Sequence, residues 1–208
     1  LKRVSQDRKT YSIEDAVLSP DEGNLHWNGL LIAESSAWPP ERVNLTSRRA
    51  KSRLKPHHIT GQAIPLPSSA YYHWLLEDLP AALASRAQAS SATFVVGAKL
   101  PRFGREFLSA TKSKFVQHSG LVTADQFVLT DKQGIVGTPQ RRDIELLLEL
   151  AHQLESRPTF HKRIYVSRSR SKRSPRWEAD LEAALASKGI DTLHLEDISW
   201  DQQVSIFK

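Results

Sequence analysis

Apolar residues recur at helical spacing through the stretch 71–80 and beyond it. Six of them would share one face of a helix: Tyr72, Leu75, Leu76, Leu79, Ala82 and Leu83. This spacing predicts a helix that buries that face. Pro80 has no backbone N–H to donate, so we expect it to kink the helix or to begin a new one.

Short apolar runs follow at intervals after residue 92 and predict buried strands. They occupy residues 93–97, 115–116, 127–129, 163–167 and 192–195. Stretches with helical periodicity lie between them. This alternation favours an α/β fold, with a doubly wound arrangement and parallel strands over residues 93–208.

Residues that start and stop helices support this reading of the second half. Pro101 suits a helix start and Gly189 a helix stop, while Ser199 is a suitable cap for a helix that runs to the end. The strongest helical periodicity of apolar residues covers 144–154 and predicts a helix that ends near residues 157–158. The first 65 residues are harder to interpret, although 25–33 should hold a strand or a turn and strand anchored by Trp27 and residues 30–32.

The predicted helix at 71–80 also carries titratable side chains. His73, Glu77 and Asp78 fall within one or two turns of a helix that should also pack a core, and in such a half-buried setting desolvation can tune an acid or base. A structural role for His73 weighs as much as a catalytic one. Trp74 is better explained as core than as a ligand-stacking residue, and Glu77 and Asp78 could simply offset a helix dipole.

Positive charge is concentrated in two clusters. The chain has 29 Lys and Arg against 23 Asp and Glu, a net charge of +6, with basic runs at 48–55 and 168–173. The first run is best explained as a solvated loop. The second follows a predicted strand and precedes a helix, where Arg168 and Arg173 could clamp a pyrophosphate, reinforced by Arg170 and Lys172. A basic surface loop without a ligand is an equal alternative.

Several chemistries find no support in the sequence. There is no cysteine, which excludes disulfides and thiol chemistry and fits a cytoplasmic location. P-loop, Gly-x-Gly-x-x-Gly, Gly-x-Ser-x-Gly, His-Glu-x-x-His and Asp-x-Asp motifs are lacking, so a metal-chelated nucleotide is not indicated. His57 and His58 are adjacent and should point apart, so a metal there would need other ligands, and we identify none.

Four short blocks resemble, in order, the signature segments of glycosyltransferase family 61. They cover residues 72–80, 95–103, 163–178 and 195–207. The first reads Tyr-His-Trp-Leu-Leu-Glu-Asp-Leu-Pro, and the third begins Arg-Ile-Tyr-Val-Ser-Arg and includes Arg173 and Glu178. Two positions depart from the pattern, because Trp177 stands in place of asparagine and Gln202 in place of glutamate.

The resemblance implies a GT-B-like fold of two Rossmann-like domains. Residues 1–157 would form the acceptor-side domain, and 158–208 would begin the nucleotide-sugar domain. We expect that second domain to be incomplete, because the family's later Gly-Ala block has no counterpart here. The absence of methionine and the apolar helical pattern still running at 204–207 also suggest part of a longer protein.

The function implied by the resemblance is inverting, metal-independent sugar transfer from a nucleotide-diphosphate sugar to a glycan or polysaccharide, as in capsule biosynthesis. His73 or Glu77 would act on the acceptor side, Arg168 and Arg173 would bind the donor diphosphate, and no cofactor or metal is expected. A peripheral membrane contact stays open. The alternatives are a nucleic-acid-binding module that uses the basic clusters, which we favour less, and a non-catalytic scaffold.

Overall fold

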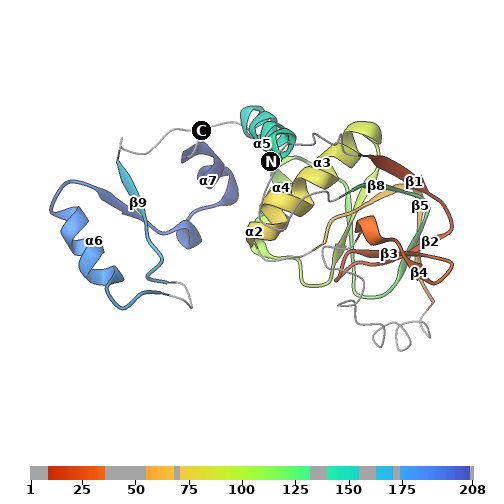
Figure 1. Ribbon diagram of the computed structural model, residues 1–208, viewed down its shortest axis with the longest axis horizontal. Coiled ribbons are helices and arrows are strands. Elements are labelled where there is room, and N and C mark those ends of the chain that lie inside the picture. Colours follow the sequence, from red (N-terminus) through yellow and green to blue (C-terminus); the bar gives the residue numbers. More distant parts are fainter. Residues whose placement is uncertain are drawn as a thin grey trace, which may run out of the picture. The chain divides into compact units, whose positions relative to one another are not determined.

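The computed structural model describes residues 9–35, 55–67, 71–131, 140–154, 163–170 and 174–206 (Figure 1). The chain divides into two compact units, Leu1–Glu149 and Leu150–Lys208. The boundary predicted after residue 157 falls outside the described residues and stays a prediction.

An eight-stranded mixed sheet forms the first unit. Its strands are β1 (Thr10–Ile13), β2 (Ala16–Ser19), β3 (Asn24–Trp27), β4 (Leu30–Leu31), β5 (His57–Pro65), β6 (Thr93–Gly97), β7 (Phe115–His118) and β8 (Val122–Thr130). Their order is β4-β3-β2-β8-β5-β6-β7, and β1 also pairs with β8. Strands β8, β5, β6 and β7 are mutually parallel, whereas β1 to β4 join by antiparallel pairing.

The sheet therefore confirms an α/β fold but not a purely parallel one. The strands predicted at 93–97, 115–116 and 127–129 are all present, as β6, β7 and β8. The antiparallel strands come from the N-terminal segment that periodicity could not resolve, because each of them has only two to four residues. A GT-B arrangement of the two units stays a prediction.

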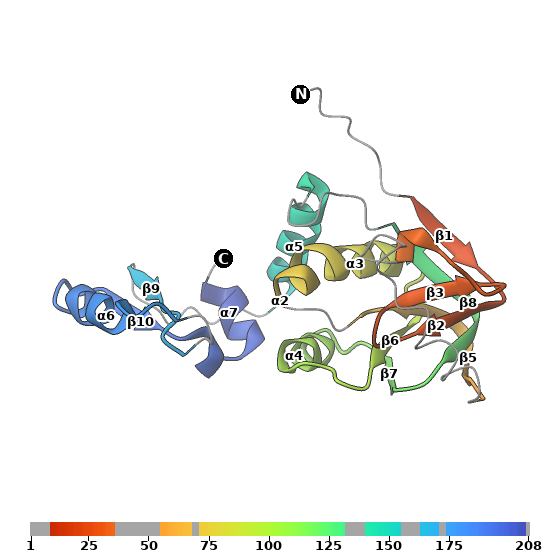
Figure 2. The same ribbon diagram turned by 60° about the horizontal axis from the view of Figure 1, so that its bottom comes forward.

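The helices of the first unit follow the parallel strands. They are α2 (Tyr71–His73), the π-helical turn η3 (Trp74–Asp78), α3 (Leu79–Gln88), α4 (Arg102–Ala110) and α5 (Arg141–Gln153), and a 3₁₀ turn η1 (Ala33–Ser35) follows β4. Helix α3 connects β5 to β6 and runs beside β8 (Figure 2). Pro101 stands at the start of α4, as predicted.

One apolar expectation for this unit is wrong. Trp27 and Leu30 do not anchor the sheet, because their side chains are 49% and 70% exposed, whereas Leu25 is fully buried. Helix α5 forms where predicted, yet Ile144 and Leu148 on its apolar face are exposed. Periodicity identifies an apolar face, but it does not show whether anything covers that face.

The core of the first unit lies against β8. Buried aliphatic and aromatic side chains from β2, β3, β5, β6 and β8 form one cluster, which includes Leu18, Leu25, Val95 and Phe127. Full burial of one such side chain stabilises the fold by about 1.5–3 kcal/mol. This cluster ties the N-terminal antiparallel strands to the parallel ones.

The second unit contains a strand–helix–strand motif. Strands β9 (Ile164–Val166) and β10 (Asp191–Leu193) pair in parallel, and α6 (Glu178–Ala186) connects them. Gly189 follows α6 with a φ of 70°, which confirms the predicted stop. The turn η4 (Leu195–Asp197) leads to α7 (Trp200–Ile206), which begins directly after Ser199, as predicted.

Gln202 completes the start of α7. Its Oε1 accepts a hydrogen bond from the Ser199 backbone N–H at 2.9 Å, which is half of a capping box. In the part of the chain that the structure describes, no helix has the length and apolar character to cross a bilayer.

Candidate active site

His73 and Glu77 lie together where the first helix widens into a π turn. The backbone N–H of Leu79 bonds to the Trp74 carbonyl five residues back, and α3 begins at Leu79 with Pro80 in its first turn. Pro80 thus begins a new helix, as expected, because its ring cannot continue the ladder. The His73 Nδ1 is 3.0 Å from Glu77 Oε1, and both side chains are half-buried.

The π turn changes which side chains face the core. Trp74 is fully buried and Asp78 almost so, while Leu75 and Leu76 of the predicted stripe are only half-buried. The Trp74 ring lies 4.9 Å from Phe103 and 5.6 Å from Phe107. The prediction that Trp74 belongs to the core is confirmed. The predicted stripe holds at Leu79 and Ala82, which are buried, but not at Leu75 and Leu76, because an i→i+5 turn shifts the face.

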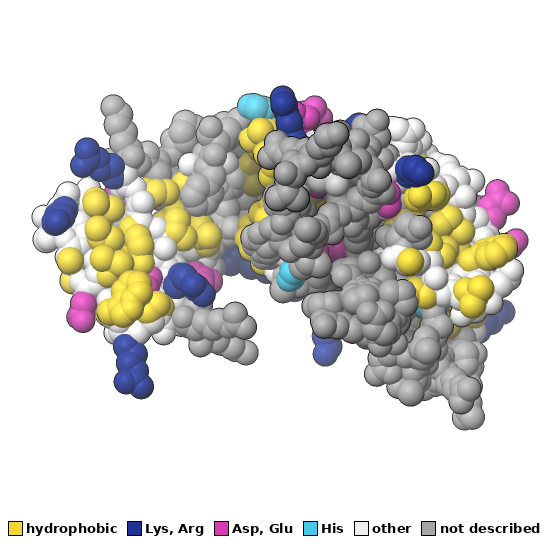
Figure 3. Space-filling view, in the orientation of Figure 1, with side chains coloured by type: hydrophobic (Ala, Val, Ile, Leu, Met, Phe, Trp, Pro, Cys, Tyr) yellow, Lys and Arg dark blue, Asp and Glu magenta, His cyan; other side chains and the backbone are white. Residues whose placement is uncertain are grey.

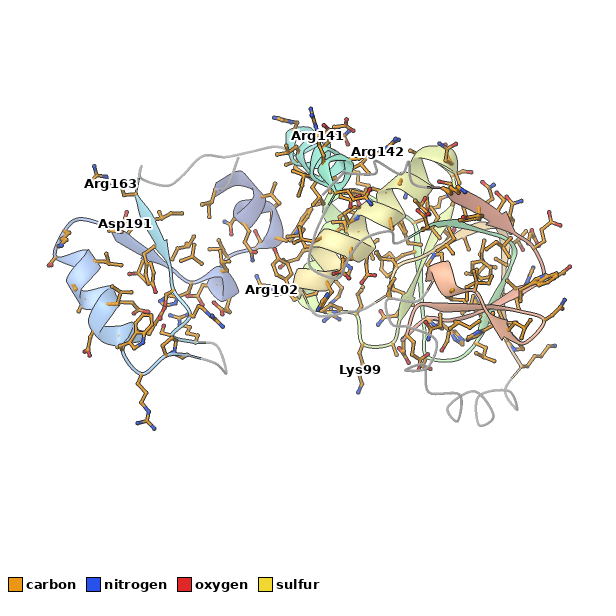
Figure 4. All side chains as sticks on the ribbon, viewed as in Figure 1. Lys99, Arg102, Arg141, Arg142, Arg163 and Asp191 are labelled. Atoms are coloured by element: carbon orange, nitrogen blue, oxygen red, sulfur yellow. The ribbon has the colours of Figure 1, made fainter. Side chains whose placement is uncertain are left out.

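The polar pair His73 and Glu77 follows the carboxyl end of β5, and the N-terminal strands pack close to that edge. The turn between β2 and β3 reaches over the ends of β5 and β6. A Cβ on Gly23 would lie 2.5 Å from Pro67, and the Ala98 backbone N–H donates to Asp21 at 2.9 Å. Lys99 and Arg102 follow β6 at the same edge (Figure 4). This is the edge where open α/β sheets bind ligands.

The second predicted site lies at the carboxyl ends of β9 and β10. Arg163 and Asp191, labelled in Figure 4, mark the opposite, amino ends of these strands. Ser167 follows β9 directly, and its backbone N–H donates to the Leu193 carbonyl at 2.9 Å. The loop that leaves the sheet therefore starts from a fixed position.

Glu178, the first residue of α6, holds this loop in place. Its side chain is only 2% exposed. Its Oε1 accepts hydrogen bonds from the Arg168 backbone N–H at 2.7 Å and from the Tyr165 hydroxyl at 2.7 Å, and Ser167 Oγ lies 3.3 Å away. Ser167 Oγ also hydrogen-bonds to Glu182. One buried carboxylate thus connects strand, loop and helix.

These contacts shift three pKa values. The Arg168 backbone N–H, followed by the Tyr165 hydroxyl, lowers the pKa of the Glu178 carboxyl although its burial opposes the shift. Hydrogen bonds from Ser167 and then Ser169 lower the pKa of Glu182. The pKa of Tyr165 is raised, first by its hydrogen bond to Glu178. Both carboxyl groups are therefore charged at neutral pH.

Of the predicted basic cluster, the structure places Arg168 and Arg170. Arg168 is exposed at the end of β9, and because Glu178 takes its backbone N–H, only its guanidinium is available to an anion. Arg170 forms an ion pair with Asp197. Arg173 and Lys172 lie outside the described residues, so the predicted two-arginine clamp stays a prediction.

From the sequence, Glu178 is only one position of a motif, and its role as the anchor was missed. A signal was present, because Tyr165 and Ser167 are two residues apart and so face the same side of an extended chain, and a carboxylate opens the next helix. A lone glutamate in a first helical turn usually complements the helix dipole. That ordinary explanation concealed its contacts with the strand.

The adjacent histidines point apart, as predicted. His58 Nε2 lies 3.1 Å from Asp125, while the His57 ring stacks on His118 at 5.1 Å. Within the described ranges, no three His, Cys, Asp or Glu side chains are grouped as metal ligands.

A family model described as Glycosyltransferase 61 matches residues 71–208, more than half of the chain. The chain belongs to glycosyltransferase family 61. It is therefore a glycosyltransferase, an enzyme that moves a sugar from a donor to an acceptor. No curated protein and no solved structure matches the chain.

The family 61 match begins at Tyr71, where α2 begins, and includes both candidate sites. Strands β1 to β5 precede it, although they form most of the sheet on which α3 packs. The structure therefore adds an N-terminal part of the first unit that the family comparison does not describe.

Proposed function

We propose that this chain transfers a sugar, with inversion and without a metal ion, from a nucleotide-diphosphate donor to a hydroxyl of a glycan or polysaccharide. The acceptor oxygen attacks the anomeric carbon from the face opposite the diphosphate. The bond from that carbon to the phosphate oxygen breaks, and the diphosphate leaves with the electron pair. The acceptor proton passes to a base on the protein.

The observation that carries this proposal is the loop anchored by Glu178. It presents the exposed Arg168 at the carboxyl end of a parallel strand, the edge where α/β sheets bind anionic ligands. A guanidinium can donate two parallel hydrogen bonds to a phosphate and so stabilise the leaving charge. Because Glu178 is fixed by several contacts, the adjacent main chain at Arg168 needs little reorganisation when a donor binds.

His73 is the group to which we assign the base, with Glu77 as its positioning residue. Glu77 accepts a hydrogen bond from Nδ1, which selects the tautomer that is unprotonated at Nε2, the atom that would take the acceptor proton. The imidazole side chain is also more exposed than the carboxylate, 35% against 18%, so an acceptor hydroxyl reaches it more easily. In other proton-transfer sites, too, a second residue orients the base through a hydrogen bond.

The cellular setting that suits this chemistry is synthesis of surface polysaccharide from cytoplasmic nucleotide sugars, with peripheral contact to the membrane where the product grows. The absence of cysteine agrees with a reducing compartment.

The test is a thermal-shift screen of nucleoside-diphosphate sugars against the full chain, followed by a transfer assay in the presence and absence of a chelator. We expect one donor class to raise the melting temperature, and transfer to persist with the chelator present. Loss of transfer on chelation would overturn metal independence. If no nucleotide sugar gives a shift, the donor assignment is wrong.

A further inference from the structure

A shallow pocket lies on the N-terminal strands, outside the residues that match family 61. It has a volume of about 490 Å³ and is lined by Ser12, Ile13, Glu14, Asp15, Trp27 and Ile32. These residues come from the end of β1, the break between β1 and β2, the end of β3 and the residue after β4. Hydrophobic side chains gather over these strands with acidic ones at their edge (Figure 3).

Trp27 forms an exposed aromatic wall held by a rigid turn. Asn28 and Gly29 both have positive φ angles, 47° and 77°, which is the two-residue hairpin turn that Asn-Gly favours. Trp27 is also paired with Ala16 on the neighbouring strand. A large aromatic side chain fixed in this way makes contacts at a low cost in conformational entropy.

Two carboxylates also line the pocket. Glu14 and Asp15 are exposed, and neither side chain makes a hydrogen bond or ion pair with another residue in the described part of the chain. Asp15 has a φ of 51° and lies at the break between β1 and β2, which both pair with β8. Both carboxylates are therefore available as hydrogen-bond acceptors.

This combination matches the two kinds of surface on a sugar ring. The C–H groups on one face of a pyranose are apolar and pack on an indole, while its hydroxyls donate to carboxylates. Ile13 and Ile32, which pack against the core, close the floor with apolar surface. A purely hydrophobic ligand would leave the carboxylates without partners.

We propose that this pocket binds one sugar unit of the acceptor glycan and selects uncharged or amino-bearing units over uronic acids. The proposal rests on the function proposed above, because an enzyme with a long glycan acceptor gains affinity from units remote from the reaction. The two carboxylates repel uronic acids and anionic lipid headgroups at this short range. A membrane is therefore the less suitable occupant.

The experiment measures binding of oligosaccharides of equal length to the full chain by isothermal titration, using neutral-hexose, amino-sugar and uronic-acid series. We expect Trp27→Ala to weaken the preferred series about tenfold and Trp27→Phe to restore part of the loss. The matched control is Leu30→Ala, which removes an exposed apolar side chain from the same hairpin outside the pocket and should bind as the parent does.

Charge is tested with the double substitution Glu14→Gln and Asp15→Asn. Asparagine tolerates the positive φ of position 15, so the backbone stays as it is. We expect neutral binding to weaken about threefold and uronic-acid binding to improve, because the repulsion is removed. If the parent protein binds the uronic-acid series more tightly than the other two series, the proposed selectivity is wrong.

Donor thermal shifts on the same preparations separate this inference from the proposed function. A donor shift without oligosaccharide binding overturns the pocket and leaves the function standing. Oligosaccharide binding that Trp27→Ala abolishes, without any donor shift, supports the pocket and overturns the donor assignment. A third outcome is that the protein binds anionic vesicles but no oligosaccharide. If Trp27→Ala and Leu30→Ala then weaken vesicle binding equally, the pocket is part of a membrane-binding surface instead.

Discussion

The two candidate sites are built in opposite ways. His73 and Glu77 belong to one helix segment and contact each other directly across four residues. Arg168 instead leaves a strand, and its main chain is fixed by Glu178 from the following helix and by neighbours on β9. One site is a pair of half-buried side chains, and the other is a loop held by a buried carboxylate.

This difference suits different tasks. A proton acceptor has to change charge during turnover, so a half-buried imidazole with one carboxylate partner is appropriate. A diphosphate site has to keep the same charge and shape, which a carboxylate with a lowered pKa and three partners helps to maintain. Substitutions at the first site should therefore change turnover, and those at the second should change donor affinity or loop stability.

The largest effect is expected for His73→Ala. General base catalysis contributes about 10²- to 10⁴-fold, so kcat should fall by that factor while the donor thermal shift is retained. Transfer assays under donor saturation measure the first quantity, and the thermal-shift assay measures the second.

Glu145→Gln provides a matched control for this pair. Glu145 makes an i,i+4 contact with Arg141 on α5 at 2.7 Å, so it resembles the His73–Glu77 pair in spacing but not in position. The kcat of the Glu145→Gln variant should equal that of the parent protein. Full turnover by His73→Ala would refute the assignment of the base.

Arg168→Ala should give the next largest effect, on donor affinity. A hydrogen bond to a charged group contributes about 1.5–3 kcal/mol, which corresponds to a loss of roughly 10- to 100-fold. Titration calorimetry with the donor found in the screen measures it directly. At saturating donor, we expect kcat to fall less for Arg168→Ala than for His73→Ala.

Arg170→Ala is the control in the same loop. Its guanidinium is already paired with Asp197, and both side chains are exposed, so its removal should change donor affinity only slightly. Equal losses for both arginines would mean that the loop acts through its overall charge, and Arg168 would have no special position.

Glu77→Gln should have a smaller effect on kcat than His73→Ala, about tenfold. The amide oxygen still accepts the Nδ1–H hydrogen bond, but a charge-assisted bond is about twice as strong as a neutral one. Glu77→Ala should lower kcat further, because the hydrogen bond that selects the tautomer is then lost. If kcat falls more for Glu77→Gln than for His73→Ala, Glu77 is the base and His73 the positioning residue.

Much of the fold could be predicted from sequence, because its signals are local. Pro80, Pro101, Gly189 and Ser199 mark helix ends through their own backbone properties, and each stands at the position expected. The apolar runs after residue 92 gave strands for the same reason. The order and direction of those strands depend on pairing with distant residues, which a single run does not encode.

The sites were less predictable, again for physical reasons. The periodicity over residues 71–80 placed His73 and Glu77 on one helix, but their direct contact is seen only in the structure. The inward turn of Asp78 depends on the π turn, and the role of Glu178 depends on packing between a helix and a strand. For the Trp27 pocket, a strand or a turn and strand was expected over residues 25–33, but no local pattern showed that Trp27 would stay exposed.

The smallest effect is expected for Glu178→Gln, and it depends on pH. The pKa of Glu178 is lowered in the folded protein, so the charged carboxylate contributes stability above its unfolded pKa and loses it as the pH falls through the folded value. We expect the variant to melt a few degrees below the parent at pH 7, with the gap closing below about pH 4. Asp180→Asn, an exposed change in the same helix, is the control. A gap that stays constant from pH 7 to about pH 3 would show that Glu178 acts by packing and not by its charge.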